Sequence, residues 1–297
     1  MSLWIAFTLF AAAVQTLRFM LQKQLKGIGL STGGATFARF LFAAPIALTA
    51  AVAGMVATGL ALPDLGPSFW GFILLGAVGQ IVATFLTVAL FSLRNFAVGI
   101  AFTKTETVQV AAFSALILSE RISAAGWIAI GIGFAGLMLI SKSPEPGARV
   151  FGRAALYGIV AGALFGLSAI GYRGATLALE PLPFLLRAVV ALAATTCLQT
   201  VLMLVWLAWR EPGEARQVLG RWRRTLPVGV TGVMGSMGWF AAFALQNAAY
   251  VRALGQVEIV FTMLASVLFF REKLRPREAL GIALVLVSVI ALVLAAA

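Results

Sequence analysis

A long internal repeat constrains the fold of this chain more than any other feature of its sequence. The stretch from Phe91 to Glu120 recurs from Phe243 to Glu272, a shift of 152 positions (243 minus 91). The polar residues that recur are the pairs Asn95 and Asn247, Glu106 and Glu258, Ser114 and Ser266, and Glu120 and Glu272. Internal repeats of this length predict two structurally related halves.

Both copies lie in sequence that is apolar enough for a membrane. Hydrophobic residues make up 62% of the chain and charged residues 11%, and the mean hydropathy is +1.03, far outside the range of soluble proteins. A helix needs about 20 residues to cross a bilayer. The sequence predicts ten such spans, at residues 3–22, 33–57, 69–91, 97–118, 124–141, 154–172, 183–208, 226–248, 254–270 and 277–296.

The spans divide evenly between the halves, and this predicts how the halves are related. We expect an all-α polytopic membrane protein with a first five-helix repeat at 1–141, a linker at 142–153 and a second repeat at 154–297. An odd number of spans per repeat inverts the second repeat relative to the first, an arrangement that is common in secondary transporters.

Composition also narrows the possible chemistry. The chain has no histidine and a single cysteine, Cys197, and we find no nucleotide-binding loop, metal-ligand cluster or catalytic Ser/His pattern in it. The sequence therefore predicts no metal, no cofactor and no enzymatic activity. The net charge of +12 comes from basic loops between spans, including 142–153 and 209–225, so it indicates cytoplasmic loops and not nucleic-acid binding.

Five ionisable residues lie within the predicted spans, away from their ends: Arg39, Lys104, Glu106, Arg187 and Glu258. A charge at the centre of a span costs about 2.5 to 3.5 kcal/mol on insertion scales, so each should face the bundle interior or a wet cavity. The repeat brings Glu106 and Glu258 to equivalent places on the fourth and ninth spans. Substrate sites of inverted-repeat transporters lie near the midplane, where such positions converge.

Two interpretations of these charges remain open. The glutamates could be structural ion-pair partners of Arg39, Arg187 or Lys104, since buried charges must be paired whatever the function. Alternatively, they could line a cavity and bind substrate or exchange protons. Arg39 and Arg187 occupy matched places in the second and seventh spans, so they could clamp an anionic substrate group or serve as salt-bridge partners.

Other polar and aromatic residues extend this candidate site. Gln109 shares a helix face with Glu106, and Gln80 is a polar residue within the third span. Trp239 lies deep in the eighth span and could stack on a ligand or fill the core. The glycines of that span, at 229, 232, 235 and 238, indicate close helix packing.

At the level of motifs, the chain resembles the drug/metabolite transporter superfamily, in its ten-helix EamA-type branch. The resemblance covers both halves. It rests on an arginine early in the second helix of each half, Arg39 and Arg187, and on two glutamates fourteen positions apart in each half, Glu106 with Glu120 and Glu258 with Glu272 (120 minus 106). Ser119 and Arg271 stand where the family usually has glycine, and Thr107 and Ile259 where it often has proline.

The resemblance implies a secondary transporter that exports a small polar or amphipathic metabolite, such as an amino acid or drug-like compound, by alternating access. Coupling to protons or to exchange is typical of such carriers. It also implies a multi-pass protein of the bacterial inner membrane, monomeric or homodimeric, whose partners are its substrate and membrane lipids. The alternative is a flippase for a lipid-linked substrate, which would need a lateral opening and apolar cavity walls.

Overall fold

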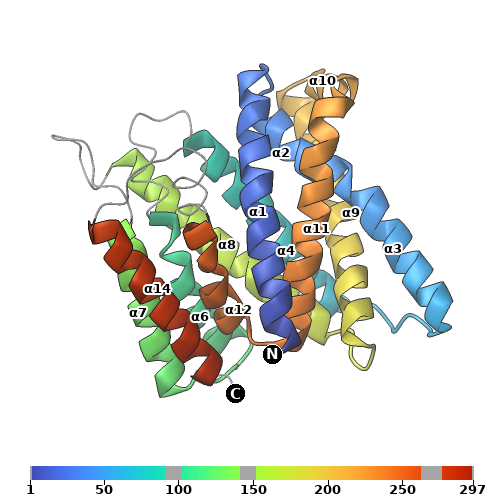
Figure 1. Cartoon of the computed structure of the whole chain (residues 1–297). Coiled ribbons are helices and arrows are strands. Elements are labelled where there is room, and N and C mark those ends of the chain that lie inside the picture. Colours follow the sequence, from blue (N-terminus) through green and yellow to red (C-terminus); the bar gives the residue numbers. More distant parts are fainter. Residues whose placement is uncertain (1, 91–101, 141–151, 262–275, 296–297) are drawn as a thin grey trace. The chain divides into compact units, whose positions relative to one another are not determined.

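The computed structural model describes residues 2–90, 102–140, 152–261 and 276–295, and these residues form helices joined by short loops, with no strand among them (Figure 1). The helices are α1 Leu3–Gly27, α2 Thr32–Leu41, α3 Ala43–Thr58, α4 Pro67–Leu90, α6 Glu106–Ile117, α7 Ala124–Ile140, α8 Arg153–Leu177, α9 Phe184–Arg210, α10 Glu214–Gly220, α11 Trp222–Leu245, α12 Ala248–Gly255 and α14 Pro276–Ala295. The all-α prediction is confirmed for the described residues.

Among the described residues, seven segments are long and apolar enough to cross a membrane: 3–22, 32–58, 67–90, 153–177, 184–210, 222–245 and 276–295. They coincide with seven of the ten predicted spans. The fourth and fifth predicted spans are represented by the shorter apolar helices α6 and α7. The ninth falls on α12, on helical residues 257–261 and on residues outside the described part, so ten spans in an inverted repeat remain a prediction.

Packing between the helices divides the chain into two compact units. The first unit comprises residues 1–81 and 171–246, and the second comprises residues 82–170 and 247–297. Each unit draws helices from both halves of the sequence, and α4 and α8 contribute to both units. This division follows proximity in space and does not bear on the sequence repeat, so the repeat boundaries at 141 and 154 stay a prediction.

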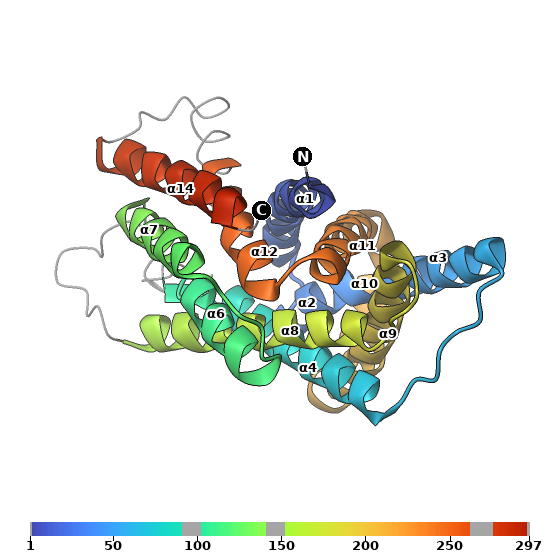
Figure 2. The same ribbon diagram turned by 90° about the horizontal axis from the view of Figure 1, so that it is seen from below.

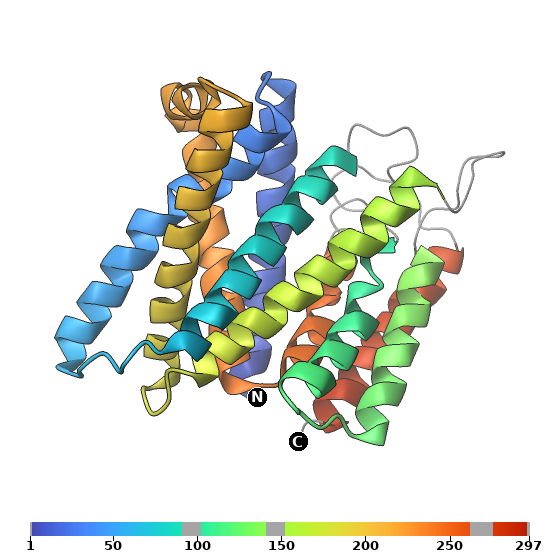
Figure 3. The ribbon, with the colours of Figure 1, turned by 180° about the vertical axis from the view of Figure 1, so that it is seen from behind.

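In the first unit α1 packs along α11, and the glycines of α11 make this possible (Figure 1). A Cβ atom added at Gly238 would lie 3.0 Å from the Ala11 side chain, and one added at Gly235 would lie 3.5 Å from the Val14 side chain. The helices therefore approach more closely than larger residues would permit, in agreement with the sequence pattern. Helix α9 packs against α3 and α11, which completes this unit around α2 (Figure 3).

The second predicted span is interrupted within the first unit. Helix α2 ends at Leu41 and α3 begins at Ala43, because Pro45 has no N–H to donate to the carbonyl of Leu41 and its ring crowds that carbonyl. This break was not expected from the sequence. It places Arg39 in the last turn of a buried half-helix.

The start of α2 is held by the segment around α10. The backbone N–H of Ser31 donates to Oε1 of Glu214 over 2.7 Å, and the Ser31 hydroxyl donates to Glu211. The same hydroxyl accepts from the N–H of Gly34 and caps the helix. Carboxylates at a helix N-terminus are stabilised by its dipole. The basic segment at 209–225 thus contains a short helix that is anchored through Glu214.

In the second unit α7 packs along α14 and α6 packs against α12 (Figure 2). The contact between α7 and α14 is close at Gly136, where an added Cβ would lie 2.7 Å from the carbonyl oxygen of Gly281. The Ser288 hydroxyl of α14 donates to the carbonyl of Ala129 over 2.7 Å. Nη2 of Arg277 donates to the carbonyl of Met138 over 3.3 Å. Small residues and interhelical hydrogen bonds therefore join this pair.

Arg173 and Arg252, which both fall between predicted spans, lie in helices α8 and α12. The predicted span that ends at residue 172 is too short, and the ninth begins too late at residue 254. The first is also too short, because α1 continues to Gly27. The ends of helices are hard to place from hydropathy alone. A polar residue that forms hydrogen bonds within a helix has the same hydropathy as a polar residue in a loop.

Candidate functional site

A small polar pocket lies inside the first unit, between α2, the start of α3, α4, α9 and α11. Its lining residues are Arg39, Phe40, Ala43, Gln80, Leu192, Thr195, Thr196, Gln199, Gly232, Ser236 and Phe240. About 220 Å³ of space lies between its atoms, counted together with adjoining solvent, and none of it is wide enough to hold a water molecule. The pocket is therefore closed to water in this conformation, and a ligand could enter only if its walls moved apart.

Arg39 is the charged residue of this pocket. Its side chain is 4% exposed, and its guanidinium carbon lies 5.4 Å from the centre of the Phe40 ring, in a cation–π arrangement. The last turn of α2 also favours a cation, because the helix dipole is negative there. The stem of Arg39 fits against α11 because residue 232 is glycine: an added Cβ would lie 3.2 Å from Arg39 Cγ.

A hydrogen-bonded network of amides and a hydroxyl forms another part of the pocket's surroundings. Nε2 of Gln199 donates to Oε1 of Gln80 over 3.0 Å and approaches the Tyr172 hydroxyl at 3.3 Å. The Tyr172 hydroxyl donates to the carbonyl of Gly76 over 3.1 Å. The Tyr172 ring packs on the ring of Phe240, with their centres 4.4 Å apart. These contacts fix the orientation of the Gln80 amide at the edge of the pocket.

The threonines of the pocket are partly occupied by their own helix. Thr195 and Thr196 donate to the carbonyls of Ala191 and Leu192 at 2.7 and 2.8 Å, as threonines within helices commonly do. Their oxygens remain acceptors. The side-chain donors of the lining include the Gln80 NH2 group, the Ser236 hydroxyl and the Arg39 guanidinium.

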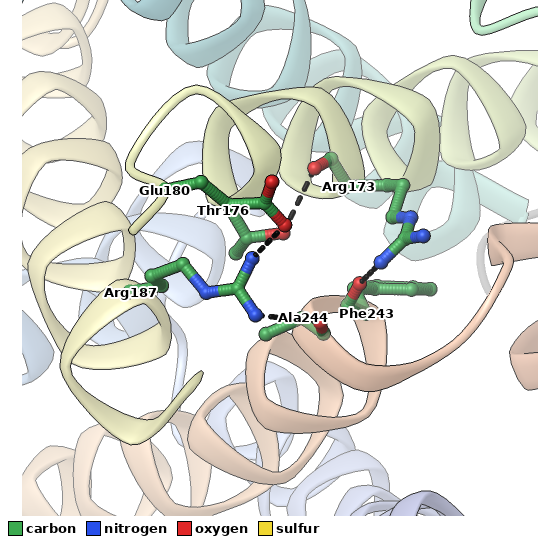
Figure 4. A network of polar contacts seen from close by, with 6 residues as sticks. All are labelled: Arg173, Thr176, Glu180, Arg187, Phe243 and Ala244. Carbon is green, nitrogen blue, oxygen red and sulfur yellow. Dashed lines mark hydrogen bonds and ion pairs between the residues drawn. The ribbon is translucent and has the colours of Figure 1, made fainter. Parts of the chain in front are cut away.

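Arg187 has a different environment from Arg39, despite their matched positions in the sequence. Its Nη1 donates to Oε1 of Glu180 over 2.6 Å, and its Nη2 donates to the carbonyl of Ala244 over 3.3 Å (Figure 4). Nη1 of Arg173 donates to the carbonyl of Phe243 over 2.5 Å. Carbonyls in the last turn of a helix have no N–H partner within the helix. The two arginines therefore supply hydrogen-bond donors to the last turn of α11.

The structure therefore does not bring Arg187 into the pocket that Arg39 lines. The salt-bridge interpretation fits Arg187, although its partner is Glu180 and not Glu106 or Glu258. Trp239 is also outside the lining. Its indole N–H donates to Oε1 of Gln15 over 3.1 Å and its ring stacks on Phe243, so it packs in the core of this unit.

The carboxylate candidates lie in the second unit. Glu106, at the start of α6, accepts from Nε of Arg252 over 2.6 Å, and Nη2 of Arg252 contacts the same oxygen. Glu106 is buried, and both Lys104 and Glu258 are near enough to interact with it electrostatically. Glu106 thus has an ion-pair partner, as one interpretation required, but that partner is Arg252.

Gln109 and Gln256 carry buried oxygens in this second unit. Within the described residues, neither Oε1 atom has a hydrogen-bond partner. Gln109 lies over Gly162 of α8, where an added Cβ would be 3.2 Å from its Oε1 atom and 2.8 Å from the carbonyl of Thr103. Glycine at 162 therefore gives α8 room to approach the start of α6.

Sequence reasoning missed several of these residues. Arg252 fell between two predicted spans, although the apolar residues on both sides of it, Tyr250 and Val251 before and Ala253 and Leu254 after, could have placed it in a helix. Gln199 and Ser236 lie inside predicted spans, and their polarity in apolar sequence was the available signal. Among the described residues, no group of three or more His, Cys, Asp or Glu could hold a metal ion.

Several helices are long and apolar enough to cross a membrane, and buried arginine and glutamine side chains lie between them. These features define a multi-pass helical membrane protein. Residues 152–294 match the model of the EamA-like transporter family, and this match places the second half of the chain in that family and confirms the resemblance seen in the sequence. The match of this half points to membrane transport of small molecules.

A solved crystal structure, whose description names no function, shares the fold. It aligns with 99% of this chain and 96% of its own, with a TM-score of 0.71 and 15% sequence identity. At this identity the similarity shows the fold alone. No curated protein matches the sequence significantly.

Proposed function

We propose that the protein is a secondary transporter that exports a small polar or amphipathic metabolite by alternating access. The observation that carries the proposal is the pocket of the first unit, where Arg39 is buried among Gln80, Gln199 and Ser236. Ionisable and polar side chains are costly inside membrane helices, so their presence around one pocket supports a binding role.

The closed state of the pocket supports alternating access. A carrier must exclude solvent from its site in part of its cycle, and a pocket too narrow for water meets that requirement. The polar side chains in its mixed lining support a small polar or amphipathic substrate over the lipid-linked alternative, because an acyl chain would leave the amides of Gln80 and Gln199 poorly solvated. Coupling through Glu106 and Glu258, to protons or to exchange, belongs to the same proposal.

A transport screen tests this function with a mixture of candidate substrates. Proteoliposomes that contain the protein are incubated with a polar metabolite extract, and the compounds retained inside are identified by mass spectrometry against protein-free liposomes. We expect one or a few small polar compounds to accumulate. Accumulation of none, or movement of fluorescent lipid between leaflets instead, would reject the proposal.

A pair of variants on α11 tests whether transport depends on the pocket. Ser236→Ala removes a hydroxyl from the lining without adding volume, so it should reduce accumulation while the protein still folds. Met234→Leu is the matched control, because Met234 is 44% exposed on the same helix and lies outside the pocket. Equal transport by both variants would show that the substrate binds elsewhere.

A further inference from the structure

We propose that the segment 209–225, which includes α10, forms a binding surface for the headgroups of anionic phospholipids. Helix α9 ends at Arg210 and α11 begins at Trp222, and both helices are candidate membrane spans. The segment that joins their ends therefore lies at one membrane surface, among lipid headgroups (Figure 1). The arginine surface comprises Trp209, Arg210, Arg216, Trp222, Arg223 and Arg224. Lipid binding there is independent of the proposed transport function.

The segment separates its charges between two faces. Its two glutamates are turned toward the start of α2, where Glu211 accepts from the Ser31 hydroxyl and Glu214 accepts from the Ser31 N–H over 2.7 Å. Glu214 is buried, and Nη1 of Arg221 donates to the carbonyl of Ile28 over 2.8 Å. The acidic groups of the segment are therefore used in contacts within the protein, on its inner face.

The other four arginines of the segment are exposed, namely Arg210, Arg216, Arg223 and Arg224. The guanidinium carbons of Arg210 and Arg223 lie 5.1 and 5.6 Å from the ring centres of the tryptophans next to them in the chain. No carboxylate of the described residues forms an ion pair with any of the four. Exposed arginines beside a membrane span attract anionic lipids, and the guanidinium fork matches a phosphate group.

The start of α11 adds to the positive potential of this surface. Arg223 and Arg224 lie in the first turn of α11, which contains no acidic side chain. The N-terminus of a helix carries partial positive charge, so cations are disfavoured there and anions are stabilised. A phosphate group bound beside this turn would offset both the helix dipole and the arginine charges.

Aromatic and apolar side chains beside the arginines favour a lipid over a soluble anion. Trp209 is 75% exposed, Trp222 is 50% exposed and Leu219 is 51% exposed. Tryptophan is typical of membrane interfaces, where its ring contacts apolar chains and its N–H reaches polar groups. A soluble phosphate would leave these side chains in water, whereas a phospholipid matches both the charged and the apolar parts of the surface.

Lipid probes test this surface on the purified full-length protein in a nonionic detergent. Thermal unfolding is followed with phosphatidylglycerol, with phosphatidylcholine of the same acyl chains, and with glycerol 3-phosphate, which has the anionic charge without the chains. A ligand that binds only the folded state raises the unfolding temperature. We expect phosphatidylglycerol to raise it most, and added salt to reduce the difference between the lipids. An equal effect of phosphatidylcholine or of glycerol 3-phosphate would overturn the inference.

Variants then assign the effect to the arginine surface. Arg216→Gln/Arg224→Gln removes two exposed charges and should weaken phosphatidylglycerol binding by about tenfold or more in a lipid titration. Arg121→Gln/Arg153→Gln is the matched control, because it removes two exposed arginines of the second unit and changes the net charge equally. An equal loss in both variants, or an unchanged affinity in Arg216→Gln/Arg224→Gln, would refute the surface. The comparison of lipids uses the parent protein alone, so it remains decisive if a variant fails to fold.

Discussion

Nε of Arg252 in α12 donates a hydrogen bond to Oε1 of Glu106 in α6 over 2.6 Å, within the second unit. The repeat equivalent of Arg252 is Ile100 (252 minus 152), which is apolar, so the same pair cannot form at Glu258. Two glutamates that match in sequence therefore differ in their surroundings. We accordingly expect them to differ in their contributions to stability and transport.

Removal of either partner of this ion pair should destabilise the protein. Glu106→Gln leaves the partly buried Arg252 charge without its carboxylate, and Arg252→Gln leaves the buried carboxylate without its cation. A loss of about 3 kcal/mol is typical for buried pairs. The double variant Glu106→Gln/Arg252→Gln should lose less than the sum, because no lone charge remains. Thermal unfolding of all three variants in detergent measures the coupling, and strict additivity would show that the pair is not energetically linked.

Transport should respond unequally to the two glutamates. We predict that Glu106→Gln and Glu258→Gln both yield folded protein, and that at least one abolishes transport or changes its pH profile. The measurement is accumulation in proteoliposomes across about pH 5.5 to 8, a range that brackets carboxylates used in proton transfer. Parent-like transport by both variants at every pH would exclude a coupling role, and the ion pair would then be structural.

Arg187 should matter for stability and not for substrate choice. Arg187→Leu removes the donor to the Ala244 carbonyl and should cost about 1 to 2 kcal/mol. Glu180→Gln removes only the ion pair, and because Glu180 is 61% exposed this change should cost less than about 1 kcal/mol. Unfolding temperatures of the two variants test the difference. A larger loss in Glu180→Gln would mean that the ion pair, and not the carbonyl, is the important contact.

Close packing of α7 on α14 predicts a strong effect of one added methyl group. Gly136→Ala places a Cβ 2.7 Å from the Gly281 carbonyl, and backbone atoms cannot easily move aside, so a loss of about 1 to 3 kcal/mol is expected. Gly131→Ala on the same helix meets nothing within 4 Å and should be neutral or stabilising, since alanine favours helix more than glycine. Similar unfolding temperatures for both variants would contradict the observed packing.

Local sequence patterns were enough to predict the class of protein, the positions of most helices and the ionisable residues that lie within the membrane spans. Hydropathy predicts the spans because each one must form its backbone hydrogen bonds within its own helix and expose apolar side chains to lipid. Seven spans and the family follow from patterns of this kind. Arg39, Glu106 and Gln80 were recognisable because ionisable and amide groups are rare in such segments.

The tertiary fold was needed to show which of these residues meet. The matched arginines have different surroundings: Arg39 lines a closed pocket, and Arg187 in α9 donates to the Ala244 carbonyl in the last turn of α11. Glu106 found its partner in Arg252, a residue 146 positions away that hydropathy left between two spans. Partners of buried polar groups are chosen by packing between distant helices, and a repeat in sequence does not fix that choice.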